Sequence, residues 1–548
     1  MRICLISREY PPDTGWGGIG AYTFQHAQAL KNLGHDVEVI SLTKEDARAD
    51  SSPEQIADPS LVPVHRAVWG NLLQELSTVW ISVPYTHFVL KSALALWRKF
   101  LEVHSVRPFD LVEAPEHLAE ALFPAITRVC PLVIRLHTPH SKFIREKYHN
   151  LNAGFDHRLV SILERMAMIE ADLLSSPSID LASYVASDTG VEPAEIRIVR
   201  NPVDTKRFCP DGPKALSNSD GPLIFFAGRL EERKGVHYLI DAVPAVLAKV
   251  PNAKFVIVGA DTKTGPGKTS VLAELHRRLA ASGCAQAVQF VNHVPLAEMP
   301  NYYRSADICV VPSLYENAPY TVLEAQSTGK PVIGTSAGGS PEYVAHDETG
   351  LVVPPRDSHA LAESIVDLSL NKDKREAMAK RARERSLSQF DREIIAQHAI
   401  ASYEFAIEQY KSEKPNALFK KSSEQSLRDF VEVLYAYHNS LCDLIYRHSF
   451  SYRAKYWIRN FAARPRLCAA KLAAAALERT PILSGQTKII LLVDRLKSQI
   501  ASREQEQQNQ VLEALLKSCN IQVPGQTSAR SASTNHNDNI ATTTQDRR

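Results

Sequence analysis

Two segments of the chain share one pattern, in which an apolar run of strand length leads through a loop into a helical stretch. The first segment has strand-like residues 2–7, a helical stretch at 21–33 and a second strand at 37–42. The second segment has a strand at 222–227 and an amphipathic helix at 236–250. Parallel strands need a crossover connection, usually a helix, so each segment predicts the start of a parallel α/β sheet.

Both segments continue into further strand-like runs, which lie at residues 111–112, 132–136, 173–176, 254–259, 287–291, 308–311 and 331–335. The whole pattern predicts an α/β fold with two Rossmann-like domains, at residues 1–203 and 204–390, followed by a helix at 391–411. In such sheets ligands bind at the carboxyl ends of the strands. We therefore expect a ligand in a central cleft between the two domains.

A separate region follows the second domain. Leu427, Phe430, Val431 and Leu434 fall at i, i+3, i+4 and i+7, which predicts an α-helical C-terminal extension over residues 420–522. From residue 525 the chain is rich in Ser, Thr, Asn and Gln, so we expect residues 523–548 to be a disordered tail.

Residues 444–477 are basic and aromatic and contain no Asp or Glu. This composition suggests a peripheral contact with an anionic membrane surface or a partner, but a helical appendage with a solvated face is the favoured interpretation. The segment 72–103 leaves a similar choice, between helices at a domain core or edge and a membrane-facing surface.

Composition excludes several classes of protein. The 548 residues exceed what one hydrophobic core usually holds, and the net charge of +2 gives no global argument for nucleic acid as a partner. Eight scattered cysteines without a C-x-x-C pair argue against a zinc site or a disulfide framework. With neither a signal peptide nor an apolar run of transmembrane length, we expect a cytoplasmic protein, or one peripheral on the inner face of the membrane.

Two glutamates near one strand end are candidates for holding a ligand. Glu316 lies in the loop after the strand at 308–311, and Glu324 lies inside a helix that begins near Pro319. Eight residues of helix span ~12 Å, too far for a shared proton but suitable for two contacts along one extended ligand. Spacing alone favours two solvated glutamates on an exposed helix.

The start of this helix adds an anion site to the pair. Its free N–H groups are expected from Tyr320, Thr321, Val322 and Leu323. Together with the helix dipole, these groups would bind a diphosphate.

Two further loops could meet the same ligand. Arg229 and Lys234, in AGRLEERKG at residues 227–235, could neutralise a diphosphate leaving group without a divalent metal, although an exposed basic loop would look the same. Gly17 and Gly18 allow close approach of backbone to a phosphate or a sugar, although a tight turn would also need them.

Taken together, these motifs resemble the large retaining glycosyltransferase family 4, whose members have the GT-B fold. The resemblance covers about residues 1–411 and rests on E-x7-E at Glu316 and Glu324, GRL-x3-KG at 228–235 and GG-I-G at 17–20. RNPVD at 200–204 is similar to the family's NGVD, with proline in place of glycine.

The resemblance implies a role for each residue. Arg229 and Lys234 would bind the donor diphosphate beside Gly18, Glu316 would contact the donor sugar, and Glu324 would hold the ribose hydroxyls. His137, in RLHTPHS, is similar to a family histidine that faces the sugar. The base would meet backbone near residues 292–294, Val294 included.

The implied reaction is transfer of a hexose, with retention and without a metal, from a UDP-, GDP- or ADP-sugar. The acceptor would be a hydroxyl of a glycan, a lipid-linked glycan or a small sugar. Glu116 or His117 could touch the acceptor, although both could equally lie in a surface loop. The alternatives are a catalytically silent scaffold and an inverting or phosphorylase enzyme of the same fold, and donor hydrolysis without an acceptor separates the scaffold from the enzyme.

Overall fold

The computed structural model describes residues 1–11, 14, 17–43, 62–69, 83–147, 154–216, 221–265, 267 and 269–412. Residues Met1–Ala417 form one compact unit, which contains both Rossmann-like domains and the helix after them. The predicted extension at 420–522, its basic segment 444–477 and the predicted tail at 523–548 lie outside the described residues.

The first domain is built on a parallel sheet of seven strands in the order β3-β2-β1-β4-β5-β6-β7. The strands are β1 Arg2–Ile6, β2 Asp36–Leu42, β3 Val64–Ala67, β4 Leu111–Pro115, β5 Leu132–Arg135, β6 Leu173–Ser176 and β7 Ile196–Ile198. The second domain has a parallel sheet in the order β10-β9-β8-β11-β12-β13. Its strands are β8 Leu223–Ala227, β9 Lys254–Val258, β10 Val288–Val291, β11 Ile308–Val311, β12 Val332–Thr335 and β13 Gly350–Val353.

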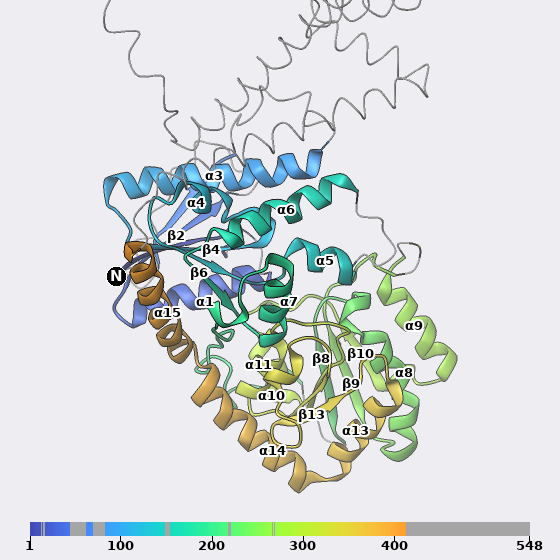
Figure 1. The fold of residues 1–548 in the computed structure, drawn as a ribbon. Helices are drawn as coiled ribbons and strands as arrows, with labels where there is room; N and C mark the ends of the chain where they lie inside the picture. Colours follow the sequence, from blue (N-terminus) through green and yellow to red (C-terminus); the bar gives the residue numbers. More distant parts are fainter. Residues whose placement is uncertain are drawn as a thin grey trace, which may run out of the picture. The chain divides into compact units, whose positions relative to one another are not determined.

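Helices cover both faces of the two sheets (Figure 1). In the first domain they are α1 Gly18–Asn32, α3 Pro84–Val106, α4 Leu122–Thr127, α5 His140–Lys147, α6 Phe155–Ile169 and α7 Ile179–Thr189. In the second they are α8 Val236–Lys249, α9 Val271–Ser282, α10 Met299–Ser305, α11 Tyr320–Ser327, α12 Ser340–Tyr343, α13 Ser358–Leu370 and α14 Lys372–Arg385, before α15 Arg392–Ser412.

Strand β8 shows why these sequences form doubly covered sheets. Ile224 and Phe226 pack into one core with α8, α9 and α13, whereas Leu223 and Phe225 pack into a second core with α10, α11 and α12. Because side chains alternate between the two faces, a strand covered on both faces must be apolar at every position. This explains the continuous apolar run LIFFA, and it confirms the predicted pair of Rossmann-like sheets.

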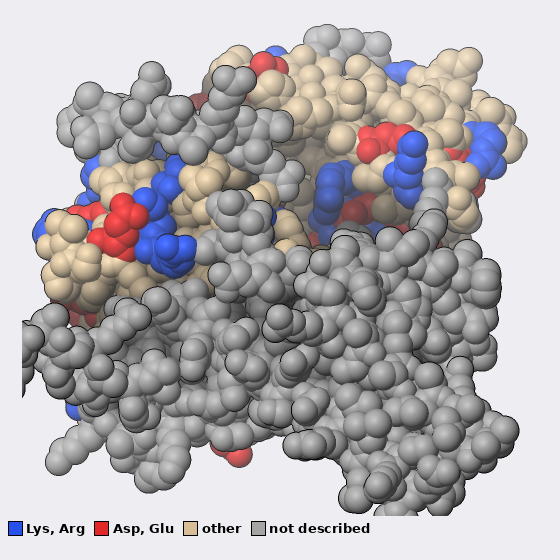
Figure 2. Space-filling view, turned by 90° about the horizontal axis from the view of Figure 1, so that it is seen from above, with Lys and Arg blue, Asp and Glu red and all other residues tan. Residues whose placement is uncertain are grey.

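Helix α3 packs on the first sheet as a core helix. Val89, Leu90, Trp97 and Phe100 are all buried, so the structure favours a core helix for this part of the 72–103 segment; residues 72–82 lie outside the described residues. In the part of the chain that the structure describes, no helix has the length and apolarity to cross a membrane. On the described part of the face in Figure 2, acidic and basic side chains are interspersed.

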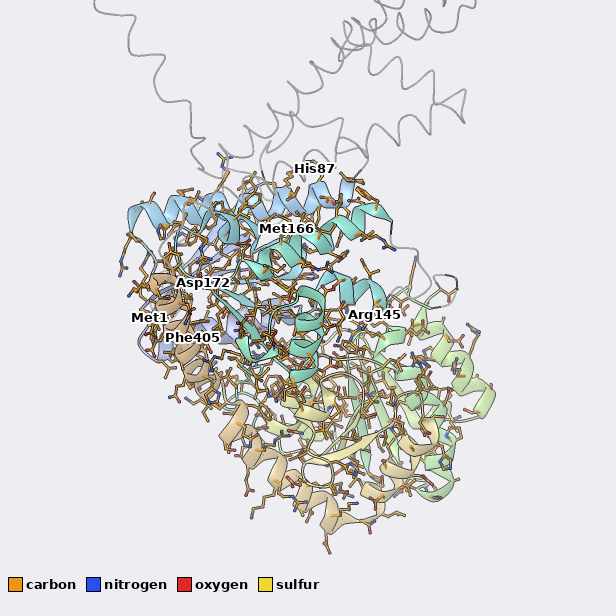
Figure 3. All side chains as sticks on the ribbon, viewed as in Figure 1. Met1, His87, Arg145, Met166, Asp172 and Phe405 are labelled. Atoms are coloured by element: carbon orange, nitrogen blue, oxygen red, sulfur yellow. The ribbon has the colours of Figure 1, made fainter. Side chains whose placement is uncertain are left out.

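Helix α15 follows the second domain and packs into a core of the first domain. Its Phe405 and the N-terminal Met1 pack against one core (Figure 3). Its Tyr403 hydroxyl donates to Glu113 at 2.6 Å and hydrogen-bonds His26 Nε2 at 2.7 Å. Burial raises the pKa of Glu113, and the two tyrosines that bind it, Tyr22 and Tyr403, satisfy its oxygens.

Candidate active site

The second sheet reverses its strand order between β8 and β11, and the loops after these two strands carry the predicted donor residues. Ligands of open α/β sheets bind at such a switch point, beyond the carboxyl ends of the strands. Residues 228–235 follow β8, and residues 312–319 follow β11. The fold therefore brings Lys234 and Glu316 together, although they are far apart in the sequence.

Lys234 and Glu316 meet directly across the switch point. The Lys234 Nζ lies 2.5 Å from Glu316 Oε1, and the Ser313 hydroxyl donates to the same oxygen at 3.0 Å. Burial alone would raise the pKa of Glu316, but the charges of Lys234 and Arg233 outweigh it and lower the pKa to about 2. Glu316 is therefore an ionised carboxylate near neutral pH.

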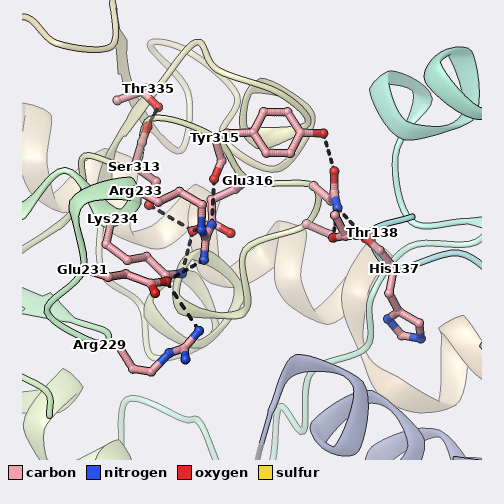
Figure 4. Close-up of polar contacts among 12 residues, drawn as sticks. His137, Thr138, Arg229, Glu231, Arg233, Lys234, Ser313, Tyr315, Glu316 and Thr335 are labelled. Atoms are coloured by element: carbon pink, nitrogen blue, oxygen red, sulfur yellow. Dashed lines mark hydrogen bonds and ion pairs between the residues drawn. The ribbon is translucent and has the colours of Figure 1, made fainter. Parts of the chain in front are cut away.

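Arg233 and Glu231, neither of them singled out in the sequence, fix the geometry of the two loops. Arg233 Nη1 donates to the Tyr315 carbonyl at 2.9 Å and lies 3.3 Å from Glu316, while its Nη2 donates to Glu231 at 2.9 Å. The Leu314 N–H donates a hydrogen bond to the Arg233 carbonyl at 2.8 Å. Figure 4 shows these side chains gathered around Glu316. Arg233 therefore links the loop after β8 to the loop after β11.

Arg229 is held only loosely at the edge of this cluster. Its Nη2 lies 3.4 Å from Glu231, and its side chain is 63% exposed. Among the described residues, the structure shows no hydrogen bond or ion pair between Arg229 and Glu316. An exposed guanidinium with one weak partner can turn toward an anion at small energetic cost. The structure therefore leaves Arg229 available for the predicted diphosphate contact.

Glu324 belongs to a different hydrogen-bond network from Glu316. It lies in α11 and accepts a bond of 2.7 Å from the Tyr303 hydroxyl. Glu324 is partly buried, and this burial raises its pKa to about 7. The two glutamates therefore have separate hydrogen-bond partners, with Glu316 in the loop and Glu324 in the helix that follows it.

The predicted anion site at the start of α11 is smaller than expected. The N–H groups of Val322 and Leu323 both donate to the Pro319 carbonyl, at 3.1 and 3.4 Å, and both side chains are in the core. Of the four predicted N–H donors, only those of Tyr320 and Thr321 remain for a ligand within the described structure. The Val294 side chain also packs in this core, so only its backbone can serve a nucleotide base.

The glycine loop of the first domain also differs from the prediction. Helix α1 begins at Gly18 rather than at residue 21, and Gly17 is its N-cap. A Cβ on Gly17 would lie 2.2 Å from the Glu9 carboxylate, whereas a Cβ on Gly18 would meet nothing within 4 Å. Gly18 therefore leaves open space at the start of a helix whose first N–H groups can face an anion.

The first sheet has its own switch point, between β1 and β4. After β4, Glu116 is fully buried and accepts the His137 N–H at 2.8 and 2.9 Å, so the prediction of a surface loop is wrong for Glu116. Glu120 accepts the Arg8 N–H at 2.9 Å across the switch point, and burial raises its pKa to about 8. His117 lies between these two glutamates and is partly exposed.

The turn that carries these residues is strained. Leu118 and Ala119 both have a φ of 52°, a left-handed conformation that non-glycine residues rarely adopt. The buried Glu164 carboxylate holds the turn by accepting the Leu118 N–H at 2.7 Å. Strain of this kind persists only where the surroundings enforce it, and it gathers at functional sites.

His137 lies at the end of β5, next to this turn. Its ring packs edge-to-face on Tyr22, with the ring centroids 5.3 Å apart. Enclosure by protein lowers the pKa of His137 well below its usual value, and the nearby Arg135 charge adds to the effect. The imidazole is therefore neutral near pH 7, and it can exchange hydrogen bonds with a sugar hydroxyl. Among the described residues no cluster of His, Cys, Asp or Glu is arranged to hold a metal ion.

Comparison with known families matches both domains. The model "Glycosyltransferase Family 4" covers residues 16–207, and the model "Glycosyl transferases group 1" covers residues 211–385. The two matched ranges follow the two domains and contain every predicted site residue.

Relatives and a solved structure agree with the family models. The chain is 30% identical to a D-inositol 3-phosphate glycosyltransferase of Corynebacterium urealyticum, over 70% of this chain and 90% of that protein. It is 29% identical to a glycogen synthase of Mycobacterium tuberculosis, over 72% and 92% of the two chains. HepE of Anabaena, solved with UDP-glucose, shares the fold with a TM-score of 0.55 at 20% identity, over 74% of this chain and 99% of that chain.

Proposed function

The chain belongs to glycosyltransferase family 4, and we propose that it moves a hexose from a nucleotide diphosphate sugar to a hydroxyl acceptor, with retention and without a metal ion. The observation that carries this proposal is the 2.5 Å pair of Lys234 and Glu316 at the β8–β11 switch point. A cation and an ionised carboxylate at the start of a helix match the two halves of a sugar diphosphate.

Donor binding would exchange the partners of this pair. In the structure Lys234 is bound to Glu316, and Arg233 stands 3.3 Å from the same carboxylate. A diphosphate would draw the Lys234 ammonium and the exposed Arg229 toward its own charge. Glu316 would keep Arg233 as its counter-ion, and it could then accept hydrogen bonds from the hydroxyls of the sugar.

The proposed chemical step follows from this arrangement. The acceptor oxygen attacks the anomeric carbon from the face that the diphosphate leaves, so the new C–O bond forms as the old one breaks. The departing phosphate oxygen takes the acceptor's proton. Lys234 and Arg229 stabilise the negative charge that develops on the diphosphate, which is the role otherwise filled by a divalent cation.

We place the acceptor at the switch point of the first sheet, between β1 and β4. Buried oxygen Oε1 of Glu120 and buried nitrogen Nη1 of Arg8 have no hydrogen-bond partner in the structure, and both can bind hydroxyl groups. We propose a glycan, a lipid-linked glycan or a small sugar as the acceptor, and a cytoplasmic location. Peripheral membrane contact through residues 444–477 also remains a proposal.

Donor affinity should depend on pH through Glu324. Its pKa of about 7 means that it gains its charge near neutrality, and a carboxylate accepts ribose hydroxyls better than a neutral acid does. Affinity for UDP-glucose should therefore rise about tenfold from pH 6 to pH 8 and then level off. Titration calorimetry at several pH values measures this affinity. The Glu324→Gln variant should bind UDP-glucose with the same weak affinity from pH 6 to pH 8. An equal pH dependence in this variant would show that another group is responsible.

The decisive experiment is a comparison of UDP-, GDP- and ADP-glucose by titration calorimetry in the presence of EDTA. We expect one nucleotide sugar to bind clearly more tightly than the others and to be hydrolysed slowly without an acceptor. Analysis of the anomer formed on transfer tests retention. Binding of none of the three donors, or a strict need for a divalent cation, would contradict the proposal.

A further inference from the structure

The loop that carries Glu316 continues into Asn317, whose side chain reaches the other domain. Its Nδ2 donates to the His137 carbonyl and, at 2.5 Å, to the Thr138 hydroxyl. Figure 4 shows His137 and Thr138 on one side of this contact and Tyr315 and Glu316 on the other. A carbonyl can only accept a hydrogen bond, so the amide group that faces His137 must be the NH₂.

A second layer of contacts fixes the orientation of that amide. The Tyr315 hydroxyl hydrogen-bonds Asn317 Oδ1, and it lies 2.8 Å from Asp180 in α7 of the first domain. The Lys142 ammonium from α5 bonds Asp180 at 3.1 Å and lies 4.5 Å from the centre of the Tyr315 ring. The side chain of Asn317 is therefore held at both ends.

The backbone at Asn317 has equally little freedom. The Gly339 N–H donates to the Glu316 carbonyl at 2.8 Å. A Cβ on Gly339 would lie only 2.0 Å from the Asn317 carbonyl oxygen. A displacement of Glu316 by a bound sugar would consequently be passed on to Asn317.

On the other side of the bridge, the His137 peptide is held from both domains. Its N–H is bound by Glu116 of the first domain and its carbonyl by Asn317 of the second. The position of the His137 backbone therefore depends on the position of the loop that carries Glu316.

We infer that Asn317 is a positioning residue that couples donor binding at Glu316 to the placement of His137 and its loop. The inference rests on the proposed function for the identity of the donor, whereas the bridge itself is a contact of the structure. The Asn317 side chain bonds the His137 carbonyl and the Thr138 hydroxyl, so its effect passes through the backbone of this loop.

Hydrogen–deuterium exchange tests the bridge without any ligand. In Asn317→Ala, exchange of the amides in residues 136–143 should be about fivefold faster or more than in the wild type. Asn317→Asp keeps the shape and an oxygen for Tyr315 but loses the NH₂ donor, so it should behave like the alanine variant. The control is Asn32→Ala, which removes an exposed hydrogen bond from the Asn32 side-chain amide in α1 to Glu393 in α15. This variant should leave exchange in residues 136–143 unchanged. Unaltered exchange in both Asn317 variants would overturn the inference.

The coupling is tested by adding UDP-glucose, which carries the sugar that would contact Glu316. In the wild type, UDP-glucose should slow exchange in residues 136–143 of the opposite domain. In both Asn317 variants that response should vanish while UDP-glucose affinity stays within about threefold, and kcat for UDP-glucose hydrolysis should fall about tenfold. Equal kcat, or an intact response to UDP-glucose, would overturn the coupling. Failure of the wild type to bind UDP-glucose would instead count against a uridine donor, and the ligand-free comparison would still decide the bridge.

Discussion

Replacing Lys234 with alanine should lower turnover of the nucleotide sugar by more than about tenfold, with a loss of 10²–10³-fold typical for one such charged donor. The ammonium lies 2.5 Å from Glu316 at the β8–β11 switch point, where a diphosphate would meet it. Because it stabilises the charge that develops on the departing diphosphate, its loss should reduce kcat more than the affinity for the donor. Steady-state kinetics with the donor identified by calorimetry measures both quantities.

The fold should survive the loss of Lys234. Glu316 would still have Arg233 at 3.3 Å and the Ser313 hydroxyl at 3.0 Å, so no unpaired buried charge remains. The melting temperature should therefore change little. Lys249→Ala, at the exposed last turn of α8, is the matched control and should retain full turnover. Near-normal rates in Lys234→Ala would remove Lys234 from the catalytic machinery.

The sequence predicted the central strands of both sheets well, and its misses share a cause. Strands β3, β7 and β13 were not predicted, and each lies at the edge of its sheet. An edge strand has one neighbour and is often short; β3 and β7 each carry an arginine, and Arg197 and Ile198 in β7 are exposed, whereas β13 is apolar but only four residues long. Central strands such as β8 are buried on both faces and leave a continuous apolar signal.

In the candidate site, the sequence predicted only part of the residues that the structure brings together. The motifs identified Lys234 and Glu316, but nothing in GRLEERKG distinguishes Arg233 and Glu231 from other charged loop residues. Their importance comes from contacts with Tyr315 and Glu316, which are distant in the sequence. The Asn317 bridge has the same origin, since its partners lie in the other domain. Spacing along a chain reports local geometry, not which loops meet.

Replacing Gly235 with alanine should destabilise the second domain and weaken donor binding together. Gly235 follows Lys234 directly and has a φ of +64°, and a Cβ there would lie 1.9 Å from the Pro312 carbonyl oxygen. The left-handed backbone alone costs an alanine about 1 kcal/mol, and relief of the clash should add roughly 1–3 kcal/mol. Since Pro312 starts the loop that carries Glu316, moving it apart from Gly235 would also separate Lys234 from Glu316.

Gly283→Ala provides a control that isolates the steric part of this effect. Gly283 ends α9 with a similar φ of +70°, but a Cβ there would meet nothing within 4 Å. Chemical denaturation should show a loss of about 1 kcal/mol for Gly283→Ala and a clearly larger loss for Gly235→Ala. Only the Gly235 variant should lose donor affinity in calorimetry. Equal losses in the two variants would mean that the backbone conformation, and not the packing of the β8 loop on the β11 loop, governs position 235.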